Sequence, residues 1–325
     1  MKSLFLSATT SSVLFIHSRH LLRRENINMA TGEKSNILIP LFDSLEKCVK
    51  TIVYNWNPIP SYCEYKLTNE TRIGNSLSLP IGTSRTNDIY LNINQSACHT
   101  LVCGNTGGGK SNCIKVILSS LLQNYPSVDI YLLDYKAVEF NMFKDVNQCK
   151  MYEYDSDRIS ESLDNLYNMI MEKYQDMMLK GKYKASIYDK TSVLFVEEIA
   201  LASKHDIKVL QKILAISRAV NFYVVLSTQR PSCDIISPVL KSLISNFICY
   251  KTNSKANSVI CIEQEGAELL EQVGRAYLKT DDSLVKFQTF YLTDDTLEEV
   301  LNNNSKHIHL EDVHDNNDEA WLNDL

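Results

Sequence analysis

Apolar residues in the middle of the chain follow two alternating patterns. Short continuous apolar runs of strand length occupy His99–Cys103, Val128–Asp134, Thr191–Val196 and Phe222–Ser227. Between these runs, apolar residues recur every three or four positions over Lys110–Tyr125, Arg158–Leu179 and Lys204–Val220. This alternation of strands and helices predicts an α/β fold, in which helices cover both faces of a mostly parallel sheet.

A different pattern precedes this region. Every second residue is apolar from Leu77 to Ile81 and again from Ile89 to Ile93, with a polar turn at 85–88 between the two segments. Alternation with a period of two predicts a β-ribbon over Leu77–Asn94. We therefore predict an N-terminal region over residues 29–98 that contains the ribbon, followed by an α/β domain over residues 99–300.

The two ends of the chain differ from the middle in composition. Residues 1–28 hold an apolar stretch, Leu4–Ile16, and then a basic one. The apolar stretch is too short to span a bilayer, and no longer apolar run follows it. We predict a disordered extension that precedes the true start at Met29, with a cleaved signal peptide as the alternative. Residues 301–325 are polar and acidic, which predicts a disordered tail.

A glycine-rich segment lies between the first predicted strand and its helix. It fits the phosphate-binding pattern Gly-x4-Gly-Lys-Ser and comprises Gly104, Asn105, Thr106, Gly107, Gly108, Gly109, Lys110 and Ser111. Glycines allow successive backbone N–H groups to converge on phosphate oxygens, and the helix N-terminus favours negative charge. We expect Lys110 to contact the β- and γ-phosphates of a nucleotide and the Ser111 hydroxyl to bind Mg²⁺.

Two acidic residues follow the buried strand Thr191–Val196. In a phosphate-loop enzyme, the first acid supports Mg²⁺ and the second polarises the attacking water. This pattern assigns the metal to Glu197 and the catalytic role to Glu198. The alternative is a pair of solvated acids that cap a helix.

Two further residues are candidates for the same site. Gln229 follows the strand Phe222–Ser227, where its amide can contact the γ-phosphate or the attacking water. Arg218 lies at the end of the preceding helix and could reach a nucleotide on a neighbouring subunit. The alternatives are a loop residue that satisfies backbone groups and a cation at a helix C-terminus.

Composition adds few constraints. A content of 44% apolar and 22% charged residues is ordinary for a soluble globular protein. The net charge of −6 does not by itself indicate nucleic-acid binding. Six acids in Glu311–Leu325 account for the excess, so a locally basic channel remains compatible with the sequence. The nine cysteines include no Cys-x-x-Cys pair; Cys98 and Cys103 have a metal-like gap but no histidine placed to complete a zinc site, so we expect reduced, mostly buried thiols.

These segments together resemble the motor domain of the FtsK/SpoIIIE family of DNA translocases, over about Ile81 to Asp294. The loop 104–111 is similar to the phosphate loop of that family. Asp134-Tyr135-Lys136 resembles its Asp-Pro-Lys strand end, and Gly266-Ala267-Glu268-Leu269-Leu270 resembles a late element. The most specific match is Thr228-Gln229-Arg230-Pro231.

The chain also departs from the family pattern. Glu197 replaces an aspartate, and Ser258-Val259 replaces a Ser-Arg pair. We expect neither the membrane-spanning N-terminal region nor the C-terminal winged-helix module of that family. The chain therefore looks like a stand-alone motor of the kind found in plasmids, phages and conjugative elements.

The resemblance implies a RecA-like fold, ATP and Mg²⁺ as cofactors, and a homo-oligomeric ring, with six subunits in the family, around double-stranded DNA. Hydrolysis at Glu198 and Lys110, helped by Gln229 and by Arg218 of a neighbour, would drive the DNA during transfer or segregation. Candidate DNA contacts are Lys241, Lys182 and Lys184, with solvated surface lysines as the alternative.

Two other functions fit the same residues. Related motor domains power protein secretion, and a weakly hydrolysing scaffold that couples partner proteins is the third hypothesis. We expect a cytoplasmic protein, which a DNA-processing or membrane partner could recruit to the membrane.

Overall fold

Ten strands form one mixed sheet in the part of the chain that the structure, a computed structural model, describes: residues 58–68, 72, 74–186 and 188–305. In chain order the strands are β1 (Leu77–Thr83), β2 (Asp88–Ile93), β3 (His99–Cys103), β4 (Asp129–Asp134), β5 (Cys149–Glu153), β6 (Ser192–Glu197), β7 (Phe222–Thr228), β8 (Asn246–Cys249), β9 (Arg275–Lys279) and β10 (Leu284–Thr289). Across the sheet they follow the order β2-β1-β10-β9-β8-β3-β7-β6-β4-β5.

The second half of this order is parallel. Strands β8, β3, β7, β6, β4 and β5 all run in the same direction. β3, β6 and β7 are buried along their whole length, as expected for parallel strands that are covered on both faces. Because β7 lies between β3 and β6, the carboxyl ends of these three strands meet at one edge of the sheet.

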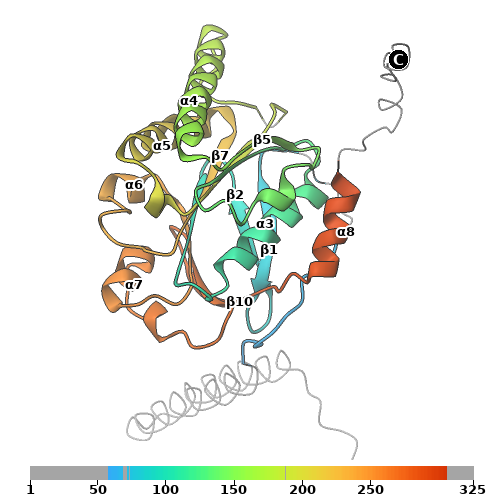
Figure 1. Ribbon diagram of the computed structural model, residues 1–325, viewed down its shortest axis with the longest axis vertical. Coiled ribbons are helices and arrows are strands. Elements are labelled where there is room, and N and C mark those ends of the chain that lie inside the picture. Colours follow the sequence, from blue (N-terminus) through green and yellow to red (C-terminus); the bar gives the residue numbers. More distant parts are fainter. Residues whose placement is uncertain (1–57, 69–71, 73, 187, 306–325) are drawn as a thin grey trace, which may run out of the picture. The chain divides into compact units, whose positions relative to one another are not determined.

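Helices cover both faces of the sheet, as the sequence predicts (Figure 1). On one face, α3 (Lys110–Asn124) and α8 (Asp294–Asn304) share a hydrophobic core with the inward residues of the sheet. A second core on the other face holds α4 (Ser156–Leu179), α5 (Lys204–Ser217), α6 (Pro238–Ser242) and α7 (Lys255–Ile262). The helical stripe predicted for α4 is buried there, at Ile159, Leu163, Leu166, Ile170 and Met177.

The first half of the order is antiparallel. β1 and β2 pair as the predicted ribbon, and β1 also pairs with β10, so the ribbon continues the main sheet. The sequence patterns did not predict β5, β8, β9 or β10. α8 ends at Asn304, so the first four residues of the predicted tail, 301–304, are helical. Residues 1–57 and 306–325, which include the predicted extension and most of the tail, lie outside the described residues, so those predictions stand as predictions. Among the described helices, none is both long and apolar enough to cross a membrane.

Candidate active site

The glycine-rich loop connects the carboxyl end of β3 to α3 and packs against the segment between β8 and β9. Gly104 has a φ of 145° and Gly109, the N-cap of α3, a φ of 112°; both values favour glycine. A Cβ on Gly104 would lie 2.5 Å from Cβ of Tyr250, and a Cβ on Gly109 would lie 2.9 Å from Cα of Gly274. The Gly274 N–H donates to the Gly108 carbonyl at 2.9 Å. The loop therefore needs its glycines for close backbone packing as well as for its dihedral angles.

Lys110 and Glu197 form a buried ion pair at the end of this loop. Lys110 is the first residue of α3 and Glu197 the last of β6, and their side chains are 3% and 1% exposed. Lys110 Nζ lies 2.5 Å from Glu197 Oε1, and the Ser227 hydroxyl donates to Glu197 Oε2. A buried charge needs such partners, and a lysine placed here is ready to exchange a carboxylate for phosphate oxygens.

Ser111 contacts an acid that the sequence analysis did not single out. Its hydroxyl donates to Glu139 Oε1 at 2.8 Å. Glu139 lies in the loop after β4, which the fully buried Asp134 holds in place by accepting hydrogen bonds from the Glu139 N–H at 2.8 Å and the Phe140 N–H at 3.1 Å. Only its position, five residues beyond the Asp134 motif, could have pointed to Glu139.

Glu198 lies beside Glu197 in an unusual backbone conformation. Its φ of 58° is left-handed, which is rare outside glycine and is common at functional sites. Its carboxylate accepts hydrogen bonds from Lys136 Nζ at 2.7 Å, Thr228 Oγ1 at 3.0 Å and the Gln229 N–H at 3.0 Å. The Glu198 N–H donates to Ser227 Oγ at 3.0 Å, so β7 fixes both the backbone and the side chain.

The same contacts set the charge of Glu198. Burial alone raises the pKa of this carboxyl, but Lys136, the Gln229 N–H and Thr228 together outweigh burial and hold the pKa below its usual value. Glu198 is therefore a carboxylate at neutral pH.

Gln229 joins the site to the glycine-rich loop. Its Oε1 accepts a hydrogen bond from Thr106 Oγ1 at 2.9 Å, while its backbone N–H holds Glu198. The loop, both acids and Gln229 thus lie together at the carboxyl ends of β3, β6 and β7.

Arg218 lies at the other edge of the sheet. It is exposed, begins a 3-10 helix at Arg218–Val220, and acts electrostatically on Cys98 and on His99, the first residue of β3. The loop begins at the far end of that strand, roughly 13 Å away at 3.3 Å per residue. Arg218 therefore lies away from the phosphate loop of its own chain.

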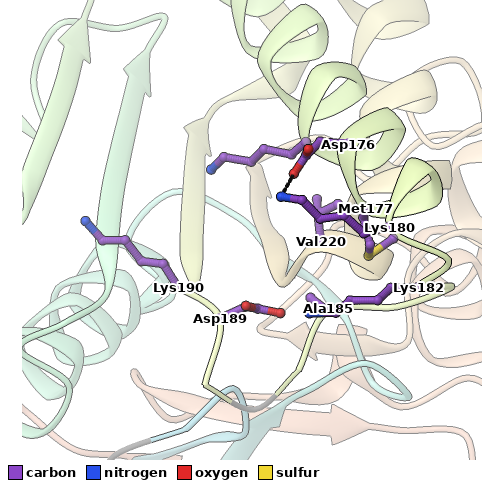
Figure 2. A pocket seen from close by; sticks show the side chains of 9 residues that line it. Asp176, Met177, Lys180, Lys182, Ala185, Asp189, Lys190 and Val220 are labelled. Carbon is purple, nitrogen blue, oxygen red and sulfur yellow. Dashed lines mark hydrogen bonds and ion pairs between the residues drawn. The ribbon is translucent and has the colours of Figure 1, made fainter.

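The three candidate DNA-binding lysines do not lie together. Lys182 and Lys184 are exposed in the turn after α4. This turn lies near Arg218, since the Ala185 N–H donates to the Ala219 carbonyl at 2.7 Å. Figure 2 shows the hollow of about 250 Å³ at this place, with Lys180, Lys182 and Lys190 among its lining residues. Lys241 lies on α6, where its Nζ is 3.3 Å from Glu263 Oε1.

The arrangement suits a magnesium nucleotide. Mg²⁺ prefers oxygen ligands, and Ser111, whose hydroxyl contacts the Glu139 carboxylate, directly follows Lys110, which pairs with Glu197. Loop N–H groups at the start of α3 and the buried ammonium of Lys110 provide the positive charge that a triphosphate requires.

Comparison with known proteins matches this chain to one family. A family model described as FtsK/SpoIIIE family covers residues 64–248, more than half of the chain. DNA translocase FtsK of Chlamydia trachomatis serovar D is 26% identical over 232 residues, which cover 62% of this chain and 29% of the relative. DNA translocase FtsK of Staphylococcus aureus strain Mu50 is 28% identical over 255 residues, which cover 70% and 32%. The chain thus spans about a third of the length of the curated relatives that it matches.

Solved structures share the fold. The pCW3 conjugation coupling protein TcpA, in its monomer form with ATPγS, superposes with a TM-score of 0.67 at 20% identity and covers 76% of this chain and 75% of its own. The cytoplasmic domain of the type VII secretion ATPase EccC from Thermomonospora curvata superposes with a TM-score of 0.62 at 19% identity, covering 75% and 32%. The fold is thus RecA-like, as predicted, and the chain belongs to the FtsK/SpoIIIE family.

Proposed function

We propose that this chain is an ATPase that couples ATP hydrolysis to the movement of double-stranded DNA. One observation carries the proposal: Lys110, Glu197, Glu198 and Gln229 come from the carboxyl ends of three strands, or just beyond them, and meet at one edge of the sheet. Relatives named DNA translocase FtsK support DNA as the substrate.

Each residue has a role that follows from its contacts. When a nucleotide binds, Lys110 exchanges its contact with Glu197 for the β- and γ-phosphates. Glu197, released from Lys110, would then hold a magnesium ion together with Ser111. Bound Mg²⁺ supplies charge neutralisation on the phosphate oxygens. Glu139 releases the Ser111 hydroxyl in the same exchange.

Glu198 orients and polarises the attacking water. It is ionised, it is held rigidly by β7, and it lies next to the acid that pairs with Lys110. Gln229 senses the γ-phosphate, because it contacts both Thr106 of the loop and Glu198. These roles match general-base and positioning chemistry in phosphoryl transfer.

Assembly completes the site. Arg218 lies at the edge opposite the phosphate loop, so it acts on the nucleotide of a neighbouring copy in a head-to-tail ring. Lys182 and Lys184 lie at the same edge as Arg218, and Lys241 remains a candidate DNA contact if it leaves Glu263.

Phosphate release, measured with and without linear duplex DNA at low salt, tests the proposal. We expect duplex DNA to raise the rate several-fold and Lys110→Ala to abolish it. A substantial rate that ignores DNA would instead favour protein secretion, which the fold shared with EccC supports. A background rate under all conditions would favour the nucleotide-binding scaffold.

A further inference from the structure

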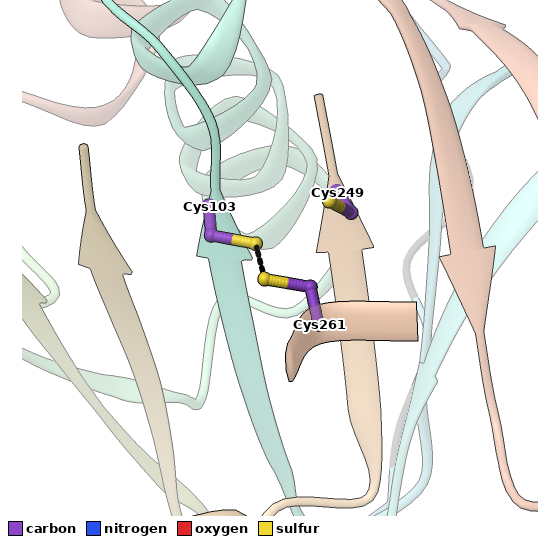
Figure 3. A group of neighbouring side chains, drawn as sticks. All are labelled: Cys103, Cys249 and Cys261. Atoms are coloured by element: carbon purple, nitrogen blue, oxygen red, sulfur yellow. Dashed lines mark hydrogen bonds between the residues drawn. The ribbon is translucent and has the colours of Figure 1, made fainter. Parts of the chain in front are cut away.

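Three cysteine side chains from three separate elements meet inside the protein. They are Cys103 at the end of β3, Cys249 at the end of β8, and Cys261 on α7 (Figure 3). All three are fully buried, at 0% exposure, and their sulfur atoms all lie within 4.8 Å of one another.

The fold explains how they come together. Cys103 and Cys249 are register partners in the parallel pair β3–β8, so their side chains project from the same face of the sheet. Helix α7 covers that face and brings Cys261 to the pair, with 2.8 Å between the Cys103 and Cys261 sulfurs. No sequence motif links the three residues, so their spacing could not predict the cluster.

We propose that Cys103, Cys249 and Cys261 form a binding site for a thiophilic cation such as Zn²⁺, separate from the nucleotide site. Thiolate sets select zinc and copper(I) over the hard cations that oxygen ligands bind. Zinc–sulfur bonds of about 2.3 Å hold ligand sulfurs roughly 3.8 Å apart, so the Cys103–Cys261 pair would open by roughly 1 Å on binding.

Metal binding would release the thiol protons of the ligands, and the bound cation would neutralise the negative charge on the three buried sulfurs.

Structural zinc sites take four ligands, so the three sulfurs leave one position to fill. Glu268, in the 3-10 helix Ala267–Leu269 after α7, acts electrostatically on Cys249. Its carboxylate is not among the groups whose ligand atoms all lie within 4.8 Å of one another, so it would have to move toward the sulfurs to become the fourth ligand.

A disulfide accounts for the cluster less well. It would join two of the three sulfurs and leave the third without a role. A bound ion uses all three sulfurs. It would also tie β3, which leads directly into the glycine-rich loop, to α7 on the covering layer.

The test is the zinc content of the full chain. The protein is purified from zinc-supplemented medium and desalted, and its zinc is measured by inductively coupled plasma mass spectrometry. We expect about one zinc per chain, and a loss of about tenfold or more in Cys261→Ser. Cys98→Ser is the matched control, because Cys98 is also buried but lies at the other end of β3, and it should keep its zinc.

A second measurement covers the case in which Cys261→Ser does not fold. Wild-type protein is stripped with a chelator under reducing conditions and titrated with Co²⁺, and a sulfur-to-metal charge-transfer band should appear at one equivalent. The proposal is overturned if wild type binds neither ion, if Cys98→Ser loses zinc equally, or if alkylation and mass spectrometry find Cys103 and Cys261 joined as a disulfide.

Discussion

At the scale of single residues, the two adjacent acids are held by different cations. Glu197 pairs with Lys110, which belongs to the phosphate loop, whereas Glu198 pairs with Lys136, which follows β4. In our proposal, a bound triphosphate competes with Glu197 for Lys110 and leaves the Lys136–Glu198 pair in place. The first ion pair would then respond to nucleotide binding, and the second would fix the charge and direction of the proposed base.

The pH dependence of hydrolysis tests the role of Lys136. A carboxylate with a lowered pKa stays ionised, and active as a base, at pH values below its usual range. Replacing Lys136 with methionine removes the cation, so the pKa of Glu198 rises and the acid limb of the pH–rate profile moves to higher pH. Lys150→Met removes a surface cation that pairs with Asp129 and should leave the limb unchanged. An acid limb that stays in place in Lys136→Met would contradict this role.

His99 makes stability depend on pH below neutrality. Burial, together with the nearby Arg218, lowers the pKa of His99 from 6.5 to about 4. Its ring donates to the Leu214 carbonyl at 3.0 Å and accepts from the Val224 N–H at 3.1 Å, so the folded state holds it neutral. The unfolded chain binds a proton below pH 6.5, and the free energy of unfolding should fall by roughly 2–3 kcal/mol between pH 6.5 and pH 4.5.

Urea unfolding across this pH range measures the effect of His99. His99→Gln keeps a donor and an acceptor without a titrating ring, and it should flatten the dependence between these two pH values. The usual range for carboxylates lies at the lower end of this interval, so they add little to it. Equal slopes in wild type and His99→Gln would rule out the assignment.

At the scale of elements, the glycine-rich loop is shaped by packing as much as by its ligand. Gly104 and Gly107 both have positive φ, at 145° and 77°, but their surroundings differ. A Cβ on Gly104 meets Tyr250, whereas a Cβ on Gly107 meets no atom within 4 Å. Comparing the two glycines therefore separates the cost of the left-handed backbone from the cost of the contact with Tyr250.

Alanine substitutions at these glycines give a matched pair. Gly107→Ala should cost roughly 1–2 kcal/mol through its left-handed backbone alone. Gly104→Ala adds a clash with Tyr250 and should cost more, with a larger loss of nucleotide affinity. Thermal unfolding and binding of a fluorescent ATP analogue measure both effects. Equal costs at the two positions would show that the contact with Tyr250 does not shape the loop.

Much of the parallel half of the sheet was predictable, because its strands are continuous apolar runs and its helices carry clear stripes. The prediction of β3 as His99–Cys103 and the prediction of α3 from Lys110 are confirmed. β8 is only four residues long, and β9 and β10 mix exposed and buried positions, so neither run length nor alternation marks them. The positions of β8, β9 and β10 in the sheet depend on hydrogen bonds to strands that are distant in the sequence, such as those between β3 and β8.

The candidate site was predictable to the same extent. Motifs at strand ends identified Lys110, Glu197, Glu198 and Gln229, because parallel strands bring their carboxyl ends together. Glu139 and the partnership of Lys136 with Glu198 depend on how the loop after β4 folds around Asp134, which no local pattern specifies. The cysteine cluster depends on strand register and was missed for the same reason.

At the scale of the whole molecule, the proposed site residues lie at two opposite edges of the sheet. The phosphate loop and the acids lie at the carboxyl edge, and Arg218 lies near the amino end of β3, where it acts electrostatically on His99. Val220, two residues after Arg218, lines the hollow in Figure 2. One copy cannot bring both edges to a single nucleotide. Our proposal therefore requires a head-to-tail assembly, in which every interface pairs one carboxyl edge with one amino edge.

Mixing two inactive variants tests this assembly. Lys110→Ala removes nucleotide binding, and Arg218→Ala removes the residue that acts on a neighbour. In an equal mixture, about a quarter of interfaces combine an intact loop with an intact arginine, so phosphate release should partly recover. Arg218→Lys, which keeps the charge without the planar fork, is the conservative control. Full activity of Arg218→Ala alone, or no recovery in the mixture, would contradict the shared site.

The most direct measurement of the central claim is the ATP-driven displacement of a third strand annealed to linear duplex DNA, compared between wild type and Glu198→Gln. We predict that wild type displaces the strand as it releases phosphate, and that Glu198→Gln binds ATP normally but loses both activities by about 10²- to 10⁴-fold. Displacement that continues in Glu198→Gln, or rapid hydrolysis by wild type with the third strand left in place, would contradict the account.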